Sequence, residues 1–319
     1  MFRLLAGVLA LATALGSAVL AAAALSNSAF AQGADPTLTP VWNLTTGFAA
    51  PESAFHDAAS NAVFVSSING QILEKDGNGY ISRLSPDGKV VAEKWATGLH
   101  APKGLRSARG VLYAADIDEV VGFDIASGKE VSRVKIEGAQ FLNDLATAPD
   151  GTVYVSDSAA LKIFEVRNGK ASVFVEGADA VEQPNGLLVD GARLILGTIG
   201  PAPVPGAGRG GPGGPGGRGP APSGHLIAFD RTSKQRTLVT TQPVGGIDGI
   251  ELDGSGGLLV TDVLGQRLLR VSRAGDVTVI AKFSAGGADF GYVPARRLAV
   301  VPFLFSNSVA AYDLTAALK

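Results

Sequence analysis

The sequence contains no cysteine and carries almost no charge imbalance, and both absences narrow the possible functions. Without a cysteine in 319 residues, neither disulfides nor thiolate metal sites can form. Acidic and basic residues nearly balance, with a formal net charge of −2 at pH 7, so the composition gives no electrostatic reason to expect binding to nucleic acid or anionic lipid. A small molecule or a protein is therefore the expected partner.

Long apolar runs are also scarce, and the most extensive one lies at the N-terminus. Arg3 precedes an apolar stretch over residues 4–25, and Ala29-Phe30-Ala31 offers a small-x-small cleavage site. This pattern predicts a signal peptide over residues 1–31 and a periplasmic or secreted mature chain over residues 32–319, with no membrane contact after cleavage. An uncleaved membrane anchor is the alternative, because about 20 apolar residues can span a bilayer.

A unit repeated six times organises the rest of the chain. Successive copies begin 51, 40, 42, 63 and 41 residues apart, close to the period of about 40–50 residues that is typical of four-stranded propeller blades. The long fourth interval contains a Gly/Pro-rich insertion over residues 200–224, which we expect to be flexible and to leave the domain beside the repeated motifs. Each copy opens with a short anchor motif: Pro51-Glu52-Ser53, Pro102-Lys103-Gly104, Leu142-Asn143-Asp144, Pro184-Asn185-Gly186, Ile247-Asp248-Gly249 and Ala288-Asp289-Phe290.

The segments after each anchor read as short apolar strands separated by turns that contain Gly, Asn or Pro. They predict an all-β fold, a six-bladed β-propeller of four-stranded blades in one domain. The sixth copy ends before a fourth strand, while a strand-like segment over residues 40–48 precedes the first anchor. We therefore expect the N-terminal strand to close the ring. A β-sandwich would explain many short strands but not six aligned anchors.

The innermost strands of a propeller all begin at the same end of the channel, so the six anchors should converge at one mouth. Carboxylate and amide oxygens are hard ligands that suit Ca²⁺, Mg²⁺ or Mn²⁺ better than Zn²⁺. The alternative is that these short polar side chains only bond turn backbones. The anchors supply the side chains of Glu52, Lys103, Asn143, Asp144, Asn185, Asp248 and Asp289.

In the order and spacing of these motifs the chain resembles the senescence-marker-protein (regucalcin), gluconolactonase and LRE-like family of six-bladed propellers. The resemblance implies one divalent metal ion, Ca²⁺ first and Mg²⁺, Mn²⁺ or Zn²⁺ as alternatives, held by Glu52, Asn185 and Asp248. It also implies that Asn143 and Asp144 contact the substrate or metal-bound water. The expected activity is hydrolysis of a lactone or ester, with Asp248 accepting a proton from the attacking water.

One position departs from the family pattern and bears on the substrate. Sugar-lactone hydrolases of the family commonly carry Arg two residues before the Asn-Asp pair, where this chain has Phe141. Phe141 cannot replace the planar donors of a guanidinium. With Phe141, Lys103 and Asn143 as substrate contacts, a less polar lactone or ester is expected, although Lys103 can equally be a solvated or salt-bridged lysine.

A second class of function remains open from the sequence. A non-catalytic propeller of the NHL type would use the same face to bind a protein or another ligand, and the fold alone does not separate the two. A coordinated set of Glu, Asn and Asp favours the enzyme. A quinone-dependent dehydrogenase is less favoured, because the mouth lacks an evident cluster of basic residues.

Overall fold

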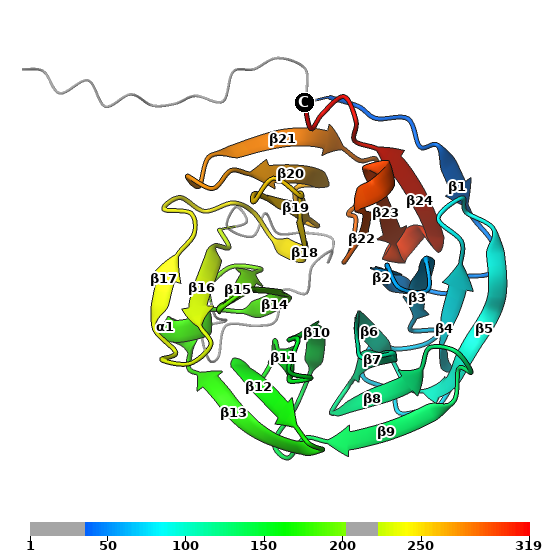
Figure 1. Cartoon of the computed structure of the whole chain (residues 1–319), viewed down its shortest axis with the longest axis vertical. Helices are drawn as coiled ribbons and strands as arrows, with labels where there is room; N and C mark the ends of the chain where they lie inside the picture. Colours follow the sequence, from blue (N-terminus) through cyan, green and yellow to red (C-terminus); the bar gives the residue numbers. More distant parts are fainter. Residues whose placement is uncertain (1–35, 202–222) are drawn as a thin grey trace, which may run out of the picture. The chain divides into compact units, whose positions relative to one another are not determined.

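Six separate four-stranded antiparallel sheets stand in a ring, each sheet forming one blade (Figure 1). The structure, a computed structural model, describes residues 36–201 and 223–319. The predicted all-β six-bladed propeller is confirmed. The expected signal peptide and nearly all of the insertion over residues 200–224 lie outside the described residues.

Within each blade the chain runs back and forth from the axis outward. The innermost strands are β2 (Pro51–Asp57), β6 (Pro102–Ala108), β10 (Leu142–Thr147), β14 (Pro184–Asp190), β18 (Ile247–Leu252) and β22 (Gly291–Val293). The second strands are β3 (Ala62–Ser67), β7 (Val111–Asp116), β11 (Val153–Asp157), β15 (Arg193–Thr198), β19 (Leu258–Asp262) and β23 (Leu298–Phe303).

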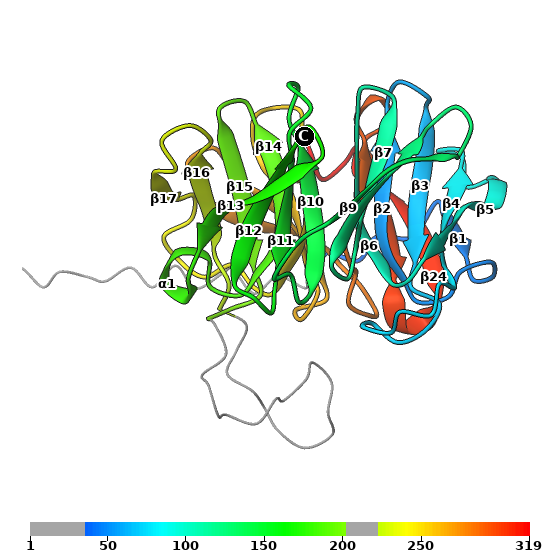
Figure 2. The ribbon, with the colours of Figure 1, turned by 90° about the horizontal axis from the view of Figure 1, so that it is seen from below.

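Two further strands complete each blade on its outer side. The third strands are β4 (Gly79–Leu84), β8 (Glu119–Asp124), β12 (Lys162–Arg167), β16 (Leu226–Asp230), β20 (Arg267–Val271) and β24 (Ser308–Asp313). The outermost strands are β5 (Val90–Leu99), β9 (Glu130–Lys135), β13 (Lys170–Glu176), β17 (Arg236–Leu238), β21 (Val277–Lys282) and β1 (Trp42–Leu44). The strands run between two faces of the ring, as the side view shows (Figure 2).

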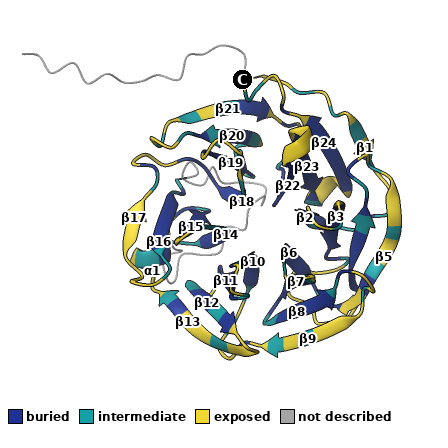
Figure 3. Cartoon of the chain, viewed as in Figure 1, coloured by how far each residue is buried: buried dark blue, intermediate teal, exposed yellow. Residues whose placement is uncertain are grey.

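Burial follows this order, because each blade packs both faces of its inner strands against neighbouring blades. Every residue of β3 is buried, whereas the outermost strand β9 alternates between exposed and half-buried residues (Figure 3). Aromatic rings pack between blades, as where Trp95 of β5 lies 4.7 Å from Phe64 and 6.2 Å from Phe123, centroid to centroid. The core is therefore divided among the blade interfaces, which fixes the position of each innermost strand.

The N-terminal strand closes the ring as predicted. β1 pairs antiparallel with β24, with Trp42 opposite Ala311 and Leu44 opposite Val309, so the last sheet has the order β1-β24-β23-β22. Short helical turns are α1 (Ala178–Val181), η1 (Pro294–Arg296) and η2 (Leu304–Ser306). Within the described ranges, none of the helices has the length and apolarity needed to cross a membrane.

Candidate functional site

A β-bulge interrupts each of the first five innermost strands at its anchor. The register with the second strand shifts between Pro51 and Ala54, and the same shift recurs between Pro102/Leu105, Leu142/Leu145, Pro184/Leu187 and Ile247/Ile250. A bulge adds a residue to one strand and re-aims its side chains. The anchor residues therefore belong to the innermost strands and not to turns that precede them.

Hydroxyl groups on the second strands stabilise three of these bulges. The backbone N–H of Ser53 donates to Ser66 Oγ over 3.0 Å, and the N–H of Asp144 donates to Ser156 Oγ over 3.0 Å. Gly249 N–H donates likewise to Thr261 Oγ1 over 2.8 Å. Because a buried backbone donor left unpaired is costly, these hydroxyls hold the bulged conformation in place.

The glycines of the anchor motifs allow neighbouring innermost strands to approach closely. A methyl group on Gly186 would lie 2.2 Å from the carbonyl oxygen of Asp248 in the next blade. A methyl group on Gly104 would similarly lie 2.6 Å from Asp144 Cα. The glycines at 104 and 186 therefore bring the polar side chains of successive blades within reach of one another.

The predicted metal ligands come together at this end of the ring. Asn185 Nδ2 donates a 3.1 Å hydrogen bond to Asp248 Oδ1, and both residues are buried. Burial, and next the charge of Asp248, raise the pKa of Glu52 well above its usual value, while Lys103 opposes the shift. Burial followed by Asp289 raises the pKa of Asp248 to about 8, against the hydrogen bond from Asn185. Carboxylates from blades 1, 5 and 6 thus repel one another in a site poor in water.

Two of the predicted metal ligands each have an oxygen atom that is buried without a hydrogen-bond partner. These atoms are Glu52 Oε2 and Asn185 Oδ1. Unpaired buried oxygens beside a carboxylate match the chemistry of a hard divalent cation. Among the described residues no three His, Asp or Glu side chains are grouped to hold a metal ion, so a cation here needs the Asn185 amide and further oxygen ligands.

Lys103 and Phe141 stand together beside the cluster. Lys103 is buried, and its Nζ donates to the carbonyl oxygens of Ala101 (3.0 Å) and Ile72 (3.3 Å). The same Nζ lies 4.6 Å from the centre of the Phe141 ring, within cation–π range. Burial lowers the pKa of Lys103 against the opposing charge of Glu52. Two of the three N–H donors of Lys103 are bonded to protein carbonyls, which leaves one for the proposed contact with substrate.

The Asn143-Asp144 pair divides between two environments. Asn143 Nδ2 donates to Ser158 Oγ over 3.1 Å. The Asp144 carboxylate accepts the backbone N–H groups of Leu145 (2.7 Å) and Leu187 (2.6 Å), so it ties blade 3 to blade 4. Burial and Asp289 raise the pKa of Asp144, whereas Arg106 lowers it. This backbone-bonding role agrees with the structural alternative, and contact with substrate stays a prediction.

The sixth anchor differs from the other five. Asp289 precedes β22 and pairs in parallel with Ser53 of β2. Its Oδ2 accepts a 2.5 Å hydrogen bond from Ser53 Oγ, while its Oδ1 is buried without a partner. The repeat placed Asp289 at the mouth correctly, but its bond with Ser53 joins the last blade to the first.

Arg106 was not among the predicted site residues, yet it closes the channel beside the cluster. Its Nη1 lies 3.4 Å from Asp289 Oδ2, and its Nη2 lies 3.3 Å from the carbonyl oxygen of Ile250 and 3.7 Å from Glu251 Oε1. Arg106 belongs to blade 2 and Ile250 to blade 5, so the side chain crosses the ring. In the sequence, the feature that could have pointed to Arg106 was a charged residue directly after Leu105 in a buried strand. We call the buried polar cluster of Glu52, Asn185, Asp248 and Asp289, with the Arg106 guanidinium beside it, the cup.

The aspartates that end three second strands bond the backbone of the segment that leads into an innermost strand. Asp116 accepts the backbone N–H groups of His100 (2.8 Å) and Ala101 (2.7 Å). Asp157 and Asp262 make equivalent bonds to Gln140 (2.7 Å) and Gly246 (2.9 Å). Each caps the segment that leads into an innermost strand, at the anchor end.

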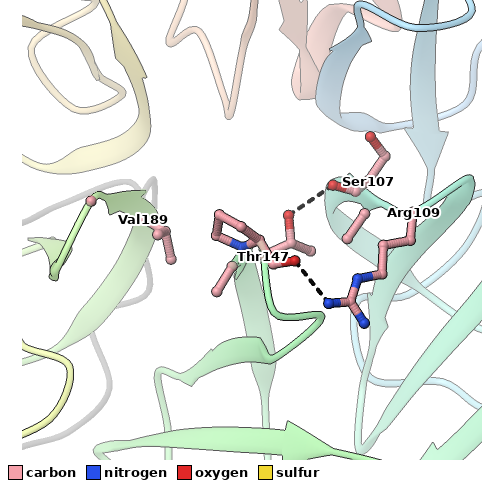
Figure 4. A pocket seen from close by; sticks show the side chains of 8 residues that line it. Ser107, Arg109, Thr147 and Val189 are labelled. Atoms are coloured by element: carbon pink, nitrogen blue, oxygen red, sulfur yellow. Dashed lines mark hydrogen bonds between the residues drawn. The ribbon is translucent and has the colours of Figure 1, made fainter.

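A hollow of about 320 Å³ lies at the opposite end of the innermost strands (Figure 4). Its wall includes Thr147, whose Oγ1 donates to Ser107 O over 2.8 Å, and Arg109, whose Nη2 donates to Pro149 O over 3.0 Å. No carboxylate lines it. Since Glu52, Asn185 and Asp248 with their buried polar atoms lie at the anchor end, that end is the candidate functional site.

No protein-family model and no curated protein sequence matches the chain. Among solved structures, a gluconolactonase from Xanthomonas campestris superposes with a TM-score of 0.62 at 15% identity, covering 88% of this chain and 95% of that one. A protein provisionally described as a gluconolactonase gives 0.58 at 16%, covering 88% and 96%. A chain of a nidogen–laminin complex gives 0.58 at 16%, covering 76% and 89%. The chain is a six-bladed β-propeller with structural neighbours in the gluconolactonase family.

Proposed function

We propose that this chain is an exported, divalent-metal-dependent hydrolase that acts on a lactone or an ester. The observation that carries the proposal is the pair of buried, unpaired oxygens, Glu52 Oε2 and Asn185 Oδ1, beside the Asp248 carboxylate. Such an arrangement is unfavourable as it stands and becomes favourable when a hard cation accepts the oxygens as ligands. Ca²⁺ suits an all-oxygen ligand set best, with Mg²⁺, Mn²⁺ and Zn²⁺ as alternatives.

The residues of the cup have distinct parts in the proposed reaction. A bound cation supplies Lewis-acid polarisation of the scissile carbonyl and lowers the pKa of water. The Asn185 amide orients the Asp248 carboxylate, which is the group best placed to accept the proton of the attacking water. Ser158 holds the Asn143 amide, which is available to orient the substrate. Phe141 and the buried Lys103 form the adjoining wall and exclude water from it.

The test is metal content and activity in matched variants. Asp248→Ala and Asn185→Ala should each lower the stoichiometry of bound Ca²⁺, measured by elemental analysis and calorimetry, without unfolding the ring. Asp179→Ala and Asn43→Ala remove the same side chains at exposed positions and should leave metal content unchanged. Hydrolysis of a lactone and ester panel should fall with metal content, by about 100-fold or more.

A binding propeller without catalysis is the second candidate, since a chain of a nidogen–laminin complex shares the fold. Unchanged metal content in both site variants, with no hydrolysis by the wild type, would favour that candidate and contradict the proposed ligand set. If the site variants lose metal but the wild type hydrolyses no substrate of the panel, the proposed cation site stands and the enzymatic function is rejected.

A further inference from the structure

Large apolar side chains are exposed on three connections beside the cup. They are Ile72 and Leu73 (each 50% exposed), Leu264 (42%) and Phe305 (81%). Each lies between the second and third strands of its blade, at the end that carries the anchors. The blades are 1, 5 and 6, which are neighbours in the closed ring (Figure 1). We name this set the apolar arc.

The connections that carry the apolar arc touch the segments leading into the anchors. The carbonyl oxygen of Ile72 accepts the hydrogen bond from Lys103 Nζ. A methyl group on Gly246, two residues before Asp248, would lie 2.7 Å from Leu264 Cγ. Asn307, which follows the Phe305 turn, accepts the Ala50 N–H over 2.7 Å, two residues before Glu52. The connections that carry the apolar arc therefore adjoin Lys103 and the segments that lead to Asp248 and Glu52.

On blades 2 and 3, the connections between the second and third strands expose no large apolar side chain. There the corresponding connections are short and carry Asp118, which is paired with Lys75 over 2.6 Å, and the small residues Ala159 and Ala160. Several other exposed apolar side chains, such as Val131 on β9 and Leu238 on β17, lie on outermost strands away from the axis. Among the described residues, large exposed apolar side chains on these connections are therefore found on the adjoining blades 1, 5 and 6, a grouping that marks a candidate binding surface. Most of the corresponding connection of blade 4 lies outside the described residues.

From this arrangement we infer that the substrate carries an acyl or alkyl chain, which lies on the apolar arc while its ester or lactone carbonyl sits in the cup. The inference rests on the proposed function and names its substrate class. Ile72, Leu73, Leu264 and Phe305 offer no side-chain partner to sugar hydroxyls, but they shield methylene groups from water. Phe141 extends the apolar wall into the cup beside Lys103. Water adds to the carbonyl and the alcohol leaves, giving a carboxylic acid and an alcohol, or a hydroxy acid from a lactone.

The test uses the full metal-loaded chain and a series of substrates that differ only in chain length. We would measure kcat/KM for p-nitrophenyl esters from acetate to decanoate, and for δ-lactones with alkyl tails of the same lengths. For the wild type, kcat/KM should rise about two- to fourfold per added methylene over the first several carbons. The double variant Ile72→Ser/Leu73→Ser and the single variant Phe305→Ser should flatten this slope and leave the acetate rate unchanged. Val131→Ser, at a site 56% exposed on β9, should behave as wild type.

The outcomes separate this inference from the proposed function. Hydrolysis of short esters with no dependence on chain length in the wild type would overturn the acyl-chain inference and keep the hydrolase. Absence of hydrolysis across the whole panel, with metal bound, would refute the hydrolase and the substrate class with it. Co-sedimentation with phosphatidylcholine vesicles that the arc variants abolish, without a chain-length effect, would assign the arc to a lipid surface instead.

Discussion

Arg106 determines the charge balance of the cup more than any other single residue. Burial alone would lower the pKa of its guanidinium, but Asp289, Asp144 and Glu251 raise it, so the side chain stays charged in the channel. Burial raises the pKa of Asp289, while Arg106 and Ser53 oppose the shift. The Arg106 guanidinium is therefore a permanent positive charge of the protein, next to the site proposed for an exchangeable metal ion.

Removing this charge should destabilise the domain without lowering occupancy of the proposed metal site. Arg106→Met leaves Asp289 buried without its cationic partner, and we expect the free energy of unfolding in urea to fall by about 3 kcal/mol. Metal stoichiometry of the folded variant should stay at the wild-type value, because Arg106 makes no bond to Glu52, Asn185 or Asp248. Arg106→Met/Asp289→Asn should recover part of the loss. If Arg106→Met has the same free energy of unfolding as the wild type, Arg106 does not stabilise the buried Asp289 carboxylate.

At the scale of the strands, the sequence predicted much and missed what depends on the closed ring. The short apolar strands predicted after each anchor are present, and they form the six four-stranded blades that the repeat indicated. The bulges at the anchors escaped prediction, because Asn-Gly and Asp-Gly also suit turns. The bond between Ser53 and Asp289 joins residues of the first and last blades, and no local pattern reports it.

The glycine after an anchor should be required for close packing of the innermost strands. In Gly186→Ala the new methyl group would meet the Asp248 carbonyl oxygen, so we expect a loss of about 1–3 kcal/mol in unfolding free energy and weaker binding of Ca²⁺. Gly169→Ala, in the turn between β12 and β13, has open space but a φ of 72°, so backbone strain of about 1 kcal/mol is expected. Calcium affinity distinguishes them, because only the change at 186 displaces a ligand. Equal calcium affinity in both variants would contradict the strand-packing explanation.

At the scale of the whole molecule, ring closure links the N-terminal segment to the geometry of the cup. Trp42 Nε1 donates a 3.1 Å hydrogen bond to Pro86 O of blade 1, while β1 pairs with β24 of blade 6. Blades 1 and 6 also meet at the cup, where Asp289 N donates to Glu52 O over 3.1 Å and Ala54 N donates to Asp289 O over 3.0 Å. Blades 1 and 6 are therefore held together in two places, by β1 at the outer side of the ring and by the Glu52 backbone near the axis.

This arrangement predicts the effect of removing the closing strand. A chain that starts at residue 49 loses β1 together with the packing of Trp42, Leu44 and Phe48 on the core between blades 6 and 1. Burial of three such side chains is worth about 5 kcal/mol, so relative to a chain that starts at residue 36 the melting temperature should fall by about 10 °C or more. The exposed edge of β24 should promote self-association, visible by light scattering. Calcium affinity should weaken as well, because blade 1 carries Glu52 and would be freer to move from blade 6. If both chains melt at the same temperature and stay monomeric, β1 does not stabilise the closed ring.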